Sequence, residues 1–441
     1  METQHVLSTI SSSSQSTFSS IASPSSLLDH LFSAFKMRFQ AIFSVAPLIT
    51  TSLAVNLYAA QYSGVISSLS LTQSGSNYTL ALTSQNPGSA PQPSWLEKHP
   101  SNDQLIFAVD ENWSGPNGTI AAYTKAATGI LTQVDEKSTA AGPVSEAFYA
   151  SGSAVAIANY AGSSVQTFTL DKTSGALKLS QTFTYTLSRP GPNPGRQDRP
   201  HPHQVLLDPS GGYIVAPDLG ADLLRVYSVN TRTLQLKEEP AVAVTPGSGP
   251  RHGAFLKTSR GITYYFLVTE LFNEVIVYRL SYGSGYTKYL SFQEVFRAGH
   301  FGPNPVPTGS SAAEVLVSVS YTSLPQPFHP CTSILMIKPQ PDKRFLVTSS
   351  RNNNGTAGPD TLQTWTIDQS TGALTFKQLH TAGGLTPRHF SLNKAGTLVA
   401  VGLQGTGAVV IYAREVSTGL IGAEVARLGG LLGVNTVIWD E

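Results

Sequence analysis

The chain has 441 residues, a formal net charge of +1 and a charged fraction of 12%. A charge balance this close to neutral gives no electrostatic basis for binding nucleic acid or an anionic membrane surface. The single cysteine, Cys331, excludes an intrachain disulfide framework and a CxxC metal site. We expect neither a metal nor another cofactor.

The N-terminal part of the sequence differs from the rest in composition. Residues 1–36 are Ser-rich and show no clear period, which predicts a disordered segment outside the fold. Residues 37–54 begin with Met37 and a basic residue, continue as an apolar stretch and end in small residues. This layout is typical of a secretory signal peptide. The stretch is short for a membrane span, so we expect no span in the mature chain.

A signal peptide at this position predicts a secreted or cell-wall protein. The alternative is a cytoplasmic protein with a disordered Ser-rich tail. Four N-x-S/T sequons, the acceptor pattern for N-glycosylation, agree with secretion. They lie at Asn77, Asn112, Asn117 and Asn354.

From residue 55 onward the sequence repeats one unit. A proline or near equivalent precedes a short apolar strand, a polar turn, a second apolar strand, a polar break and an alternating strand, as in a propeller blade. The units begin at Pro93, Pro143, Pro202, Pro250, Ser333 and Pro387. One interval, between Pro250 and Ser333, is too long, and residues 282–330 within it are predicted to be an insertion.

Both ends of the repeat region contain strand patterns that are incomplete by themselves. Residues 55–62, 65–71 and 78–83 look like the last three strands of a blade, and residues 433–440 look like the missing first strand. If both termini complete one blade, the ring closes and leaves no exposed sheet edge. The sequence therefore predicts an all-β fold, a seven-bladed β-propeller of four-stranded antiparallel blades, over residues 55–441.

Four segments at blade spacing contain His, Arg and Glu residues that a generic propeller does not need. They are HPHQVLLDPSGGYIVAPDLGAD, GPRHGAF with a following strand that ends in Thr269-Glu270, SSRNN, and TPRHFSLNKAGTLVAVGLQ. With these segments in this order, residues 57–440 resemble the lactonase family of seven-bladed propellers. That family includes bacterial 6-phosphogluconolactonases and fungal carboxy-cis,cis-muconate cyclases.

The resemblance also implies which residues carry the chemistry. The implied catalytic residues are His203, Arg251, Glu270 and Arg351. Residues at neighbouring or equivalent turns are implied to bind substrate, namely His201, His252 and Arg388. Equivalent turns of successive blades point to the same end of a central channel, so these residues can converge although they are far apart in the chain.

The residue types suit a small, multiply charged anionic substrate. Arginine binds carboxylate or phosphate in a two-pronged manner and stays protonated. Glu270 and His203 can transfer protons as general acid or base. Asp110, Glu111 and Asp218, at predicted strand ends, can line the channel or hold a structural cation.

Three functions fit this pattern. The first two are lactone-forming or lactone-opening enzymes on a small carboxylate or phosphate substrate, with the carboxy-cis,cis-muconate cyclase reaction ranked before the 6-phosphogluconolactonase reaction. For the cyclase, an arginine holds the developing negative charge and Glu270 or His203 supplies a proton. For the lactonase, the same groups activate water and hold the oxyanion. The third is a secreted or cell-surface glycoprotein that acts in binding or as an antigen without catalysis.

Overall fold

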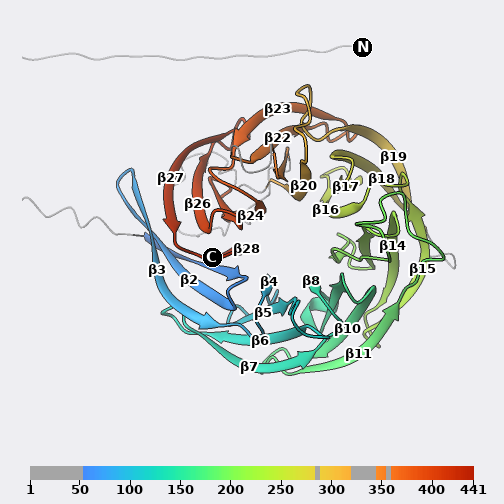
Figure 1. The fold of residues 1–441 in the computed structure, drawn as a ribbon, viewed down its shortest axis with the longest axis horizontal. Coiled ribbons are helices and arrows are strands. Elements are labelled where there is room, and N and C mark those ends of the chain that lie inside the picture. The colour runs from blue at the N-terminus through green and yellow to red at the C-terminus, as the bar shows by residue number, and fades with distance from the viewer. Residues whose placement is uncertain (1–52, 284–288, 319–343, 354–358) are drawn as a thin grey trace, which may run out of the picture. The chain divides into compact units, whose positions relative to one another are not determined.

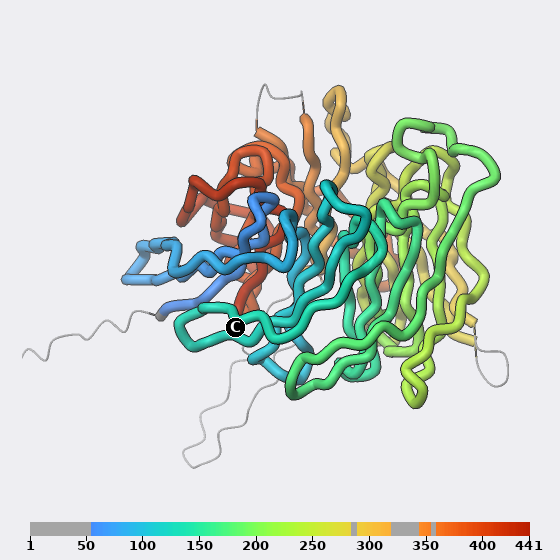
Figure 2. The backbone as a smooth tube through the Cα atoms, turned by 60° about the horizontal axis from the view of Figure 1, so that its bottom comes forward, coloured from blue at the N-terminus to red at the C-terminus, as the bar shows by residue number. Residues whose placement is uncertain are grey.

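The structure is a computed structural model that describes residues 53–283, 289–318, 344–353 and 359–441. Within these residues it contains seven sheets, each of four antiparallel strands, and one 3₁₀ turn, η1 (Ala150–Gly152). Figure 1 shows the sheets as blades around a central axis, and Figure 2 shows them from a second direction, following one another along the chain. The predicted seven-bladed β-propeller is confirmed.

Each of six blades is built from four consecutive strands, and the first strand lies nearest the axis. The first three of these blades are β4 (Pro93–Lys98), β5 (Leu105–Asp110), β6 (Thr119–Lys125), β7 (Leu131–Ser138); β8 (Pro143–Tyr149), β9 (Ala154–Asn159), β10 (Ser164–Leu170), β11 (Leu177–Thr184); and β12 (Leu206–Leu207), β13 (Tyr213–Asp218), β14 (Leu223–Asn230), β15 (Gln235–Ala243). The next three are β16 (Pro250–Lys257), β17 (Thr263–Thr269), β18 (Glu274–Tyr282), β19 (Leu290–Gly299); β20 (Ser311–Val317), β21 (Phe345–Arg351), β22 (Thr361–Ile367), β23 (Leu374–Thr381); and β24 (Pro387–Leu392), β25 (Leu398–Leu403), β26 (Ala408–Arg414), β27 (Ile421–Gly429).

The position of a strand within its blade explains its sequence pattern. Every residue of β5, β9 and β25 is buried, because the second strand of a blade is covered on both faces by neighbouring blades. The outermost strand β7 is mostly exposed and correspondingly polar. Apolar runs therefore mark inner strands, and polar alternation marks the rim.

The hydrophobic core is divided among the interfaces between blades. One cluster packs Ala156 and Ala158 of β9 against Ile214 and Ala216 of β13 in the next blade. Because each blade packs mainly against its two neighbours, the ring needs no single central core. The axis is left available for polar side chains.

The closing blade joins the two termini. β28 (Val434–Asp440) pairs antiparallel with β1 (Leu53–Gln61), which is followed by β2 (Val65–Ser74) and β3 (Asn77–Pro87). Asn56 lies opposite Asp440 at one end of the pairing, and Gln61 lies opposite Val434 at the other. The predicted closure by both termini in one blade is confirmed.

The predicted start of the fifth repeat unit is wrong. The innermost strand of that blade is β20, which lies upstream of Ser333, and residues 282–330 are not an insertion because they contain β19 and β20. Two features conceal these strands in the sequence. β19 is an outer strand with a polar, half-exposed face, and Glu314 interrupts the apolar run of β20. The long interval instead falls after β20, on residues 319–343, which lie outside the described residues.

The predicted N-terminal segments, 1–36 and most of 37–54, also lie outside the described residues. β1 begins at Leu53, two residues before the predicted start of the propeller. Leu53 and Ala54 pair only with β2, whereas the pairing with β28 begins at Asn56. In the described part of the chain, no helix has the length and apolar character needed to cross a membrane.

Candidate active site

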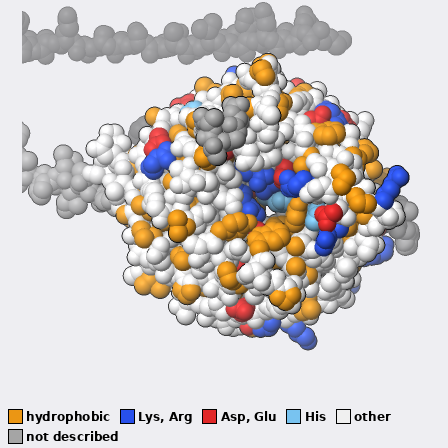
Figure 3. Space-filling view, viewed as in Figure 1, with side chains coloured by type: hydrophobic (Ala, Val, Ile, Leu, Met, Phe, Trp, Pro, Cys, Tyr) orange, Lys and Arg blue, Asp and Glu red, His pale blue; other side chains and the backbone are white. Residues whose placement is uncertain are grey.

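Arginine, histidine and glutamate side chains meet at one end of the central channel. Figure 3 looks onto this end and shows Lys and Arg side chains gathered around a hollow at the centre of the ring. The cavity has a volume of about 200 Å³ and is lined by Tyr62, Glu111, Trp113, Val144, Tyr160, Arg196, His203, Arg251, Glu270, Arg351 and Arg388. The structure therefore brings together all four residues of the implied catalytic set, and Arg388 with them.

Local strand irregularities aim two of the arginines into the cavity. In β16 the register shifts between Pro250 and His252, so that Arg251 is the extra residue of a bulge. The same shift occurs in β24 around Arg388. A bulge turns a side chain out of the regular ladder, and here it directs the guanidinium toward the axis. The repeated Pro-Arg-His sequence thus produces the same local structure in two blades.

Glu270 is the centre of the arginine cluster. It directly follows β17, and its side chain is 3% exposed. Its Oε2 lies 2.8 Å from Arg251 Nε and 3.0 Å from Arg351 Nη2, and its Oε1 lies 2.7 Å from Arg196 Nη2. One carboxylate therefore contacts three guanidinium groups from three different blades or loops.

These contacts decide the charge of Glu270. Burial by itself would raise its pKa, but Arg351, Arg251 and Arg196 outweigh burial and lower the pKa to about 2. Glu270 is thus ionised at neutral pH and has no proton to donate. Burial and the neighbouring Arg351 lower the pKa of Arg251 to about 9, so Arg251 remains charged at neutral pH.

Arg388 belongs to a second polar group that lines the same cavity. Its Nη2 lies 2.6 Å from Glu111 Oε1, and its Nη1 lies 2.5 Å from the Tyr62 hydroxyl. The Tyr62 hydroxyl donates to Glu111 Oε2 at 2.7 Å, and the Trp113 indole N–H also donates to that oxygen. Glu111 therefore lines the channel, which is one of the two roles predicted for it.

The charges on the cavity walls do not balance. Four arginines line the cavity, and Glu111 and Glu270 are the two carboxylates among its lining residues. Two positive charges are left without a counterion in the described walls. Arg251, Arg351 and Arg388 are largely shielded from water, so their charge attracts an anion more strongly than that of an exposed arginine.

Behind the arginines, two histidines and a glutamate form a continuous chain. His203 Nδ1 lies 3.1 Å from His252 Nε2, and His252 Nδ1 lies 3.0 Å from Glu314 Oε2. All three side chains are buried. Burial and the adjacent positive charge of Arg251 lower the pKa of His203 and of His252 well below the usual range, so both imidazoles are neutral.

The order of this chain couples the tautomer of His203 to the charge of Glu314, whose pKa burial raises above its usual range. When Glu314 is ionised, it accepts the Nδ1 proton of His252, whose Nε2 then accepts the Nδ1 proton of His203. With Glu314 ionised, the Nε2 of His203 is left without a proton on a residue that lines the cavity. A neutral imidazole held in one tautomer by a partner is the arrangement of a general base.

His201 does not line the cavity, although it lies two residues from His203. Its ring stacks on Tyr160 with a centroid distance of 4.1 Å. Its Nδ1 lies 2.8 Å from the Tyr160 carbonyl oxygen, and its Nε2 lies 2.9 Å from Asp198. Both ring nitrogens are engaged, so His201 orients Tyr160 rather than facing a ligand.

Sequence reasoning missed Arg196, Tyr62 and Glu314. Arg196 had a usable signal, since it lies in the same short segment as the HPH motif, GRQDRPHPH. Glu314 also had one, because a lone glutamate inside the apolar run AAEVLV is unusual in a buried strand. Tyr62 had none, because only ring closure brings the first blade next to the last.

The predicted glycosylation sites fall in different environments. Asn77 and Asn117 are exposed. The Asn112 side-chain amide donates to the Asn117 carbonyl oxygen at 2.8 Å, so it is engaged within its own loop. Asn354 lies outside the described residues.

Comparison with known proteins shows the family to which the chain belongs. The model of the family described as "Lactonase, 7-bladed beta-propeller" matches residues 52–430. The chain is 27% identical over 348 residues to a protein of Arthroderma benhamiae named "Probable 6-phosphogluconolactonase", covering 78% of this chain and 79% of the relative. It is also 27% identical to the 6-phosphogluconolactonase of Formosa agariphila, covering 74% of this chain and 82% of the relative.

Among solved structures, the chain is similar to the periplasmic gluconolactonase of Pseudomonas aeruginosa. The TM-score is 0.70 at 22% sequence identity, and the superposition covers 88% of this chain and 99% of that one. A likeness at this identity concerns the fold. The family match covers most of the chain, and the protein belongs to the lactonase family of seven-bladed β-propellers.

Proposed function

We propose that the protein hydrolyses a sugar lactone that carries an anionic group, such as 6-phosphoglucono-δ-lactone. One observation carries the proposal. A cavity whose described walls hold four arginines and two carboxylates is also lined by a neutral histidine, whose Nδ1 is engaged by His252. The names of the relatives, among them 6-phosphogluconolactonases, support the same substrate class.

Substrate binding would rest on the arginine cluster. Guanidinium groups match the geometry of phosphate and carboxylate oxygens. Glu270 holds Arg251 and Arg351 in place while leaving part of their charge unsatisfied, so that the site is organised before an anion arrives. Such preorganisation avoids the cost of ordering flexible side chains on binding.

The chemical step would begin at His203. Its Nε2 removes a proton from water, and the water oxygen forms a bond to the lactone carbonyl carbon. Arg251 stabilises the negative charge that develops on the carbonyl oxygen. The ring C–O bond then breaks, and the leaving ring oxygen takes up the proton from His203. One water is consumed, and the product is an open-chain hydroxy acid.

The cyclase reaction is less well supported by the same geometry. That reaction requires a proton donor for the carbon next to the bond that forms. Glu270 is ionised because its pKa is lowered to about 2, and His203 is neutral because its pKa is lowered by burial. Neither group holds a proton to donate at neutral pH. Lactone hydrolysis instead requires a general base, and a neutral histidine can act as one.

A hydrolysis assay tests the proposal. The rate on 6-phosphoglucono-δ-lactone is measured above spontaneous hydrolysis, with glucono-δ-lactone and 3-carboxy-cis,cis-muconate as parallel substrates. We expect turnover of the phosphorylated lactone, a higher KM without the phosphate, and a loss of about 10²-fold or more in kcat for His203→Gln. Arg279→Gln, which changes an exposed arginine on β18, serves as the matched control.

Two results would count against the proposal. A wild-type rate equal to spontaneous hydrolysis would remove the lactonase reaction. Turnover of the muconate, with no turnover of either lactone, would assign the cyclase reaction instead.

We also propose that the protein is secreted or resides in the cell wall. The exposure of Asn77 and Asn117 is compatible with glycans at both positions. A cleavage after Ala54 would remove only two residues from the start of β1, and these residues pair with β2 alone. Sequencing the N-terminus of the protein from its native source tests this proposal, and a product that retains Met1 and has no glycans would contradict it.

A further inference from the structure

A second and larger cavity lies at the other end of the central channel. Its volume is about 910 Å³. The inner strands run from one cavity to the other, since β16 contributes Arg251 to the first and Phe255 to the second. β4 likewise places Ser94 beside the histidines, and further along the strand it places Glu97 on the wall of this second cavity. The two cavities are therefore separate spaces along one axis.

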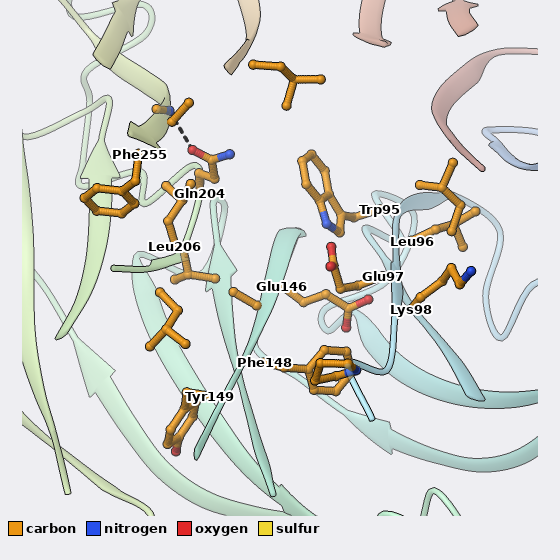
Figure 4. A pocket seen from close by; sticks show the side chains of 18 of the residues that line it. Trp95, Leu96, Glu97, Lys98, Glu146, Phe148, Tyr149, Gln204, Leu206 and Phe255 are labelled. Carbon is orange, nitrogen blue, oxygen red and sulfur yellow. Dashed lines mark hydrogen bonds between the residues drawn. The ribbon is translucent and has the colours of Figure 1, made fainter. Parts of the chain in front are cut away.

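Three glutamates line this second cavity, and Glu314 among them is engaged by His252, which leaves the carboxyl groups of Glu97 and Glu146 from adjacent blades. Figure 4 shows Glu97 of β4 and Glu146 of β8 with their carboxyl ends next to each other. Glu146 is 2% exposed, and neither of its carboxyl oxygens has a hydrogen-bond partner. A buried carboxyl group without a hydrogen-bond partner destabilises the fold. Its presence on a cavity wall indicates a ligand that supplies the missing partner.

No described lining residue supplies a compensating positive charge. Lys98 is the one lysine or arginine among the lining residues. Its Nζ lies 2.9 Å from Asp440, and Figure 4 shows the amine directed away from Glu97 and Glu146. Burial raises the pKa of Glu97 to about 7, and burial together with Glu97 raises that of Glu146 well above its usual range. Near neutral pH the pair therefore has less than its full negative charge.

The walls around the pair define the chemistry of the missing ligand. They are mostly apolar and aromatic, with Trp95, Phe148 and Phe255 among them (Figure 4). Within the described residues no group of three His, Cys, Asp or Glu side chains is placed to hold a metal ion. An organic ammonium satisfies both requirements, because its N–H groups bind carboxylate while its apolar body contacts the walls and its charge faces aromatic rings.

We infer that this cavity binds an organic monocation, a primary ammonium attached to an apolar body, with Glu97 and Glu146 as its anionic partners. Glu97 and Glu146 do not line the arginine cavity, and the inference does not depend on the proposed lactonase reaction. The channel thus has opposite charge preferences at its two ends.

The test is calorimetric titration of the full chain with n-hexylammonium chloride, at constant ionic strength. 1-Hexanol has the same apolar body without the charge and serves as the control ligand. We expect saturable binding of hexylammonium, weakened about tenfold or more in Glu97→Gln and in Glu146→Gln. Glu136→Gln, which changes an exposed carboxylate on the outer strand β7, should bind as the wild type does.

Thermal unfolding shows whether each variant is folded. Glu146→Gln is expected to melt at or above the wild-type temperature, because it removes a buried ionisable group that has no partner. If this variant does not fold, Glu97→Gln tests the inference. The Glu97 residue is only partly buried, so its replacement is expected to disturb the fold less.

Three results would overturn the inference. They are no binding of hexylammonium to the wild type, equal binding to Glu146→Gln, and equal binding of 1-hexanol. Saturable binding of CaCl₂ that both variants abolish, without binding of hexylammonium, would identify a metal site instead. Lactone hydrolysis is measured in the same preparations, so failure of that reaction and failure of this site are observed separately.

Discussion

Replacing Glu270 by glutamine tests the electrostatic organisation of the arginine cavity most directly. Glutamine keeps the shape of the side chain but removes the charge that Arg196, Arg251 and Arg351 contact at distances from 2.7 to 3.0 Å. The Arg251 side chain is 1% exposed, so its guanidinium cannot recover hydration from water. Loss of one partner from a buried ion pair costs about 3–5 kcal/mol. We expect the free energy of unfolding in urea to fall by about 3 kcal/mol, the lower end of that range, because glutamine still accepts hydrogen bonds.

Inorganic phosphate should rescue this variant. Without Glu270 the cavity has three uncompensated positive charges instead of two, so phosphate should bind Glu270→Gln more tightly than the wild type. A ligand present at 100 times its Kd stabilises the folded state by about 2.7 kcal/mol. Phosphate at that concentration should therefore restore most of the lost stability. The urea titrations are repeated with phosphate and with NaCl of equal ionic strength, which separates specific binding from screening.

Glu424→Gln is the matched control. Glu424 contacts Arg427 at 2.7 Å, but that pair lies on the surface and should contribute only about 0–1 kcal/mol. A Glu270→Gln variant as stable as the wild type, with unchanged phosphate affinity, would refute the reasoning, because it would show that the arginines do not depend on their shared carboxylate.

Three further predictions concern pH, closure and packing. Burial lowers the pKa of His203 and His252, so unfolding lets both imidazoles take up protons, and the free energy of unfolding should decrease as the pH falls below about 6.5. Urea titrations between neutral and acidic pH measure this decrease, which should be smaller in His203→Gln. Deletion of residues 434–441 removes β28 and exposes the edge of β1, so gel filtration should show aggregation instead of a compact monomer-sized peak. Gly372→Ala adds a Cβ 2.6 Å from Tyr264 and should lower the free energy of unfolding in urea by about 1–3 kcal/mol. Gly261→Ala should cost less, because Gly261 has a similar positive φ but no atom lies within 4 Å of the added Cβ.

Much of the fold was predictable because its signals are local and repeat. Inner strands are apolar on both faces, and each blade starts from similar turn residues, so strand order and blade number follow from the pattern. The closing blade was predictable for the same reason, since residues 433–440 match the missing strand of the unit. The prediction failed in the fifth blade, where the buried Glu314 breaks the apolar run and the pattern alone favours a later start.

Only those residues of the candidate site that lie in recognisable motifs could be predicted. His203, Arg251, Glu270 and Arg351 lie in recognisable segments and do line one cavity. Their charge states and partners depend on contacts between residues tens to hundreds of positions apart. Arg388 and Tyr62 are neighbours only because the ring closes, and Glu314 meets His252 only because adjacent inner strands run side by side.

The sequence by itself therefore determined the ring, its closure and the identity of the principal polar residues at the channel mouth. The tertiary structure alone decided that His203 joins a chain through His252 to Glu314, why Glu270 is ionised, and where Glu97 and Glu146 meet. The physical reason is that strand formation follows from local alternation and burial, whereas a pKa or a hydrogen-bond chain depends on side-chain direction and on the distance between blades.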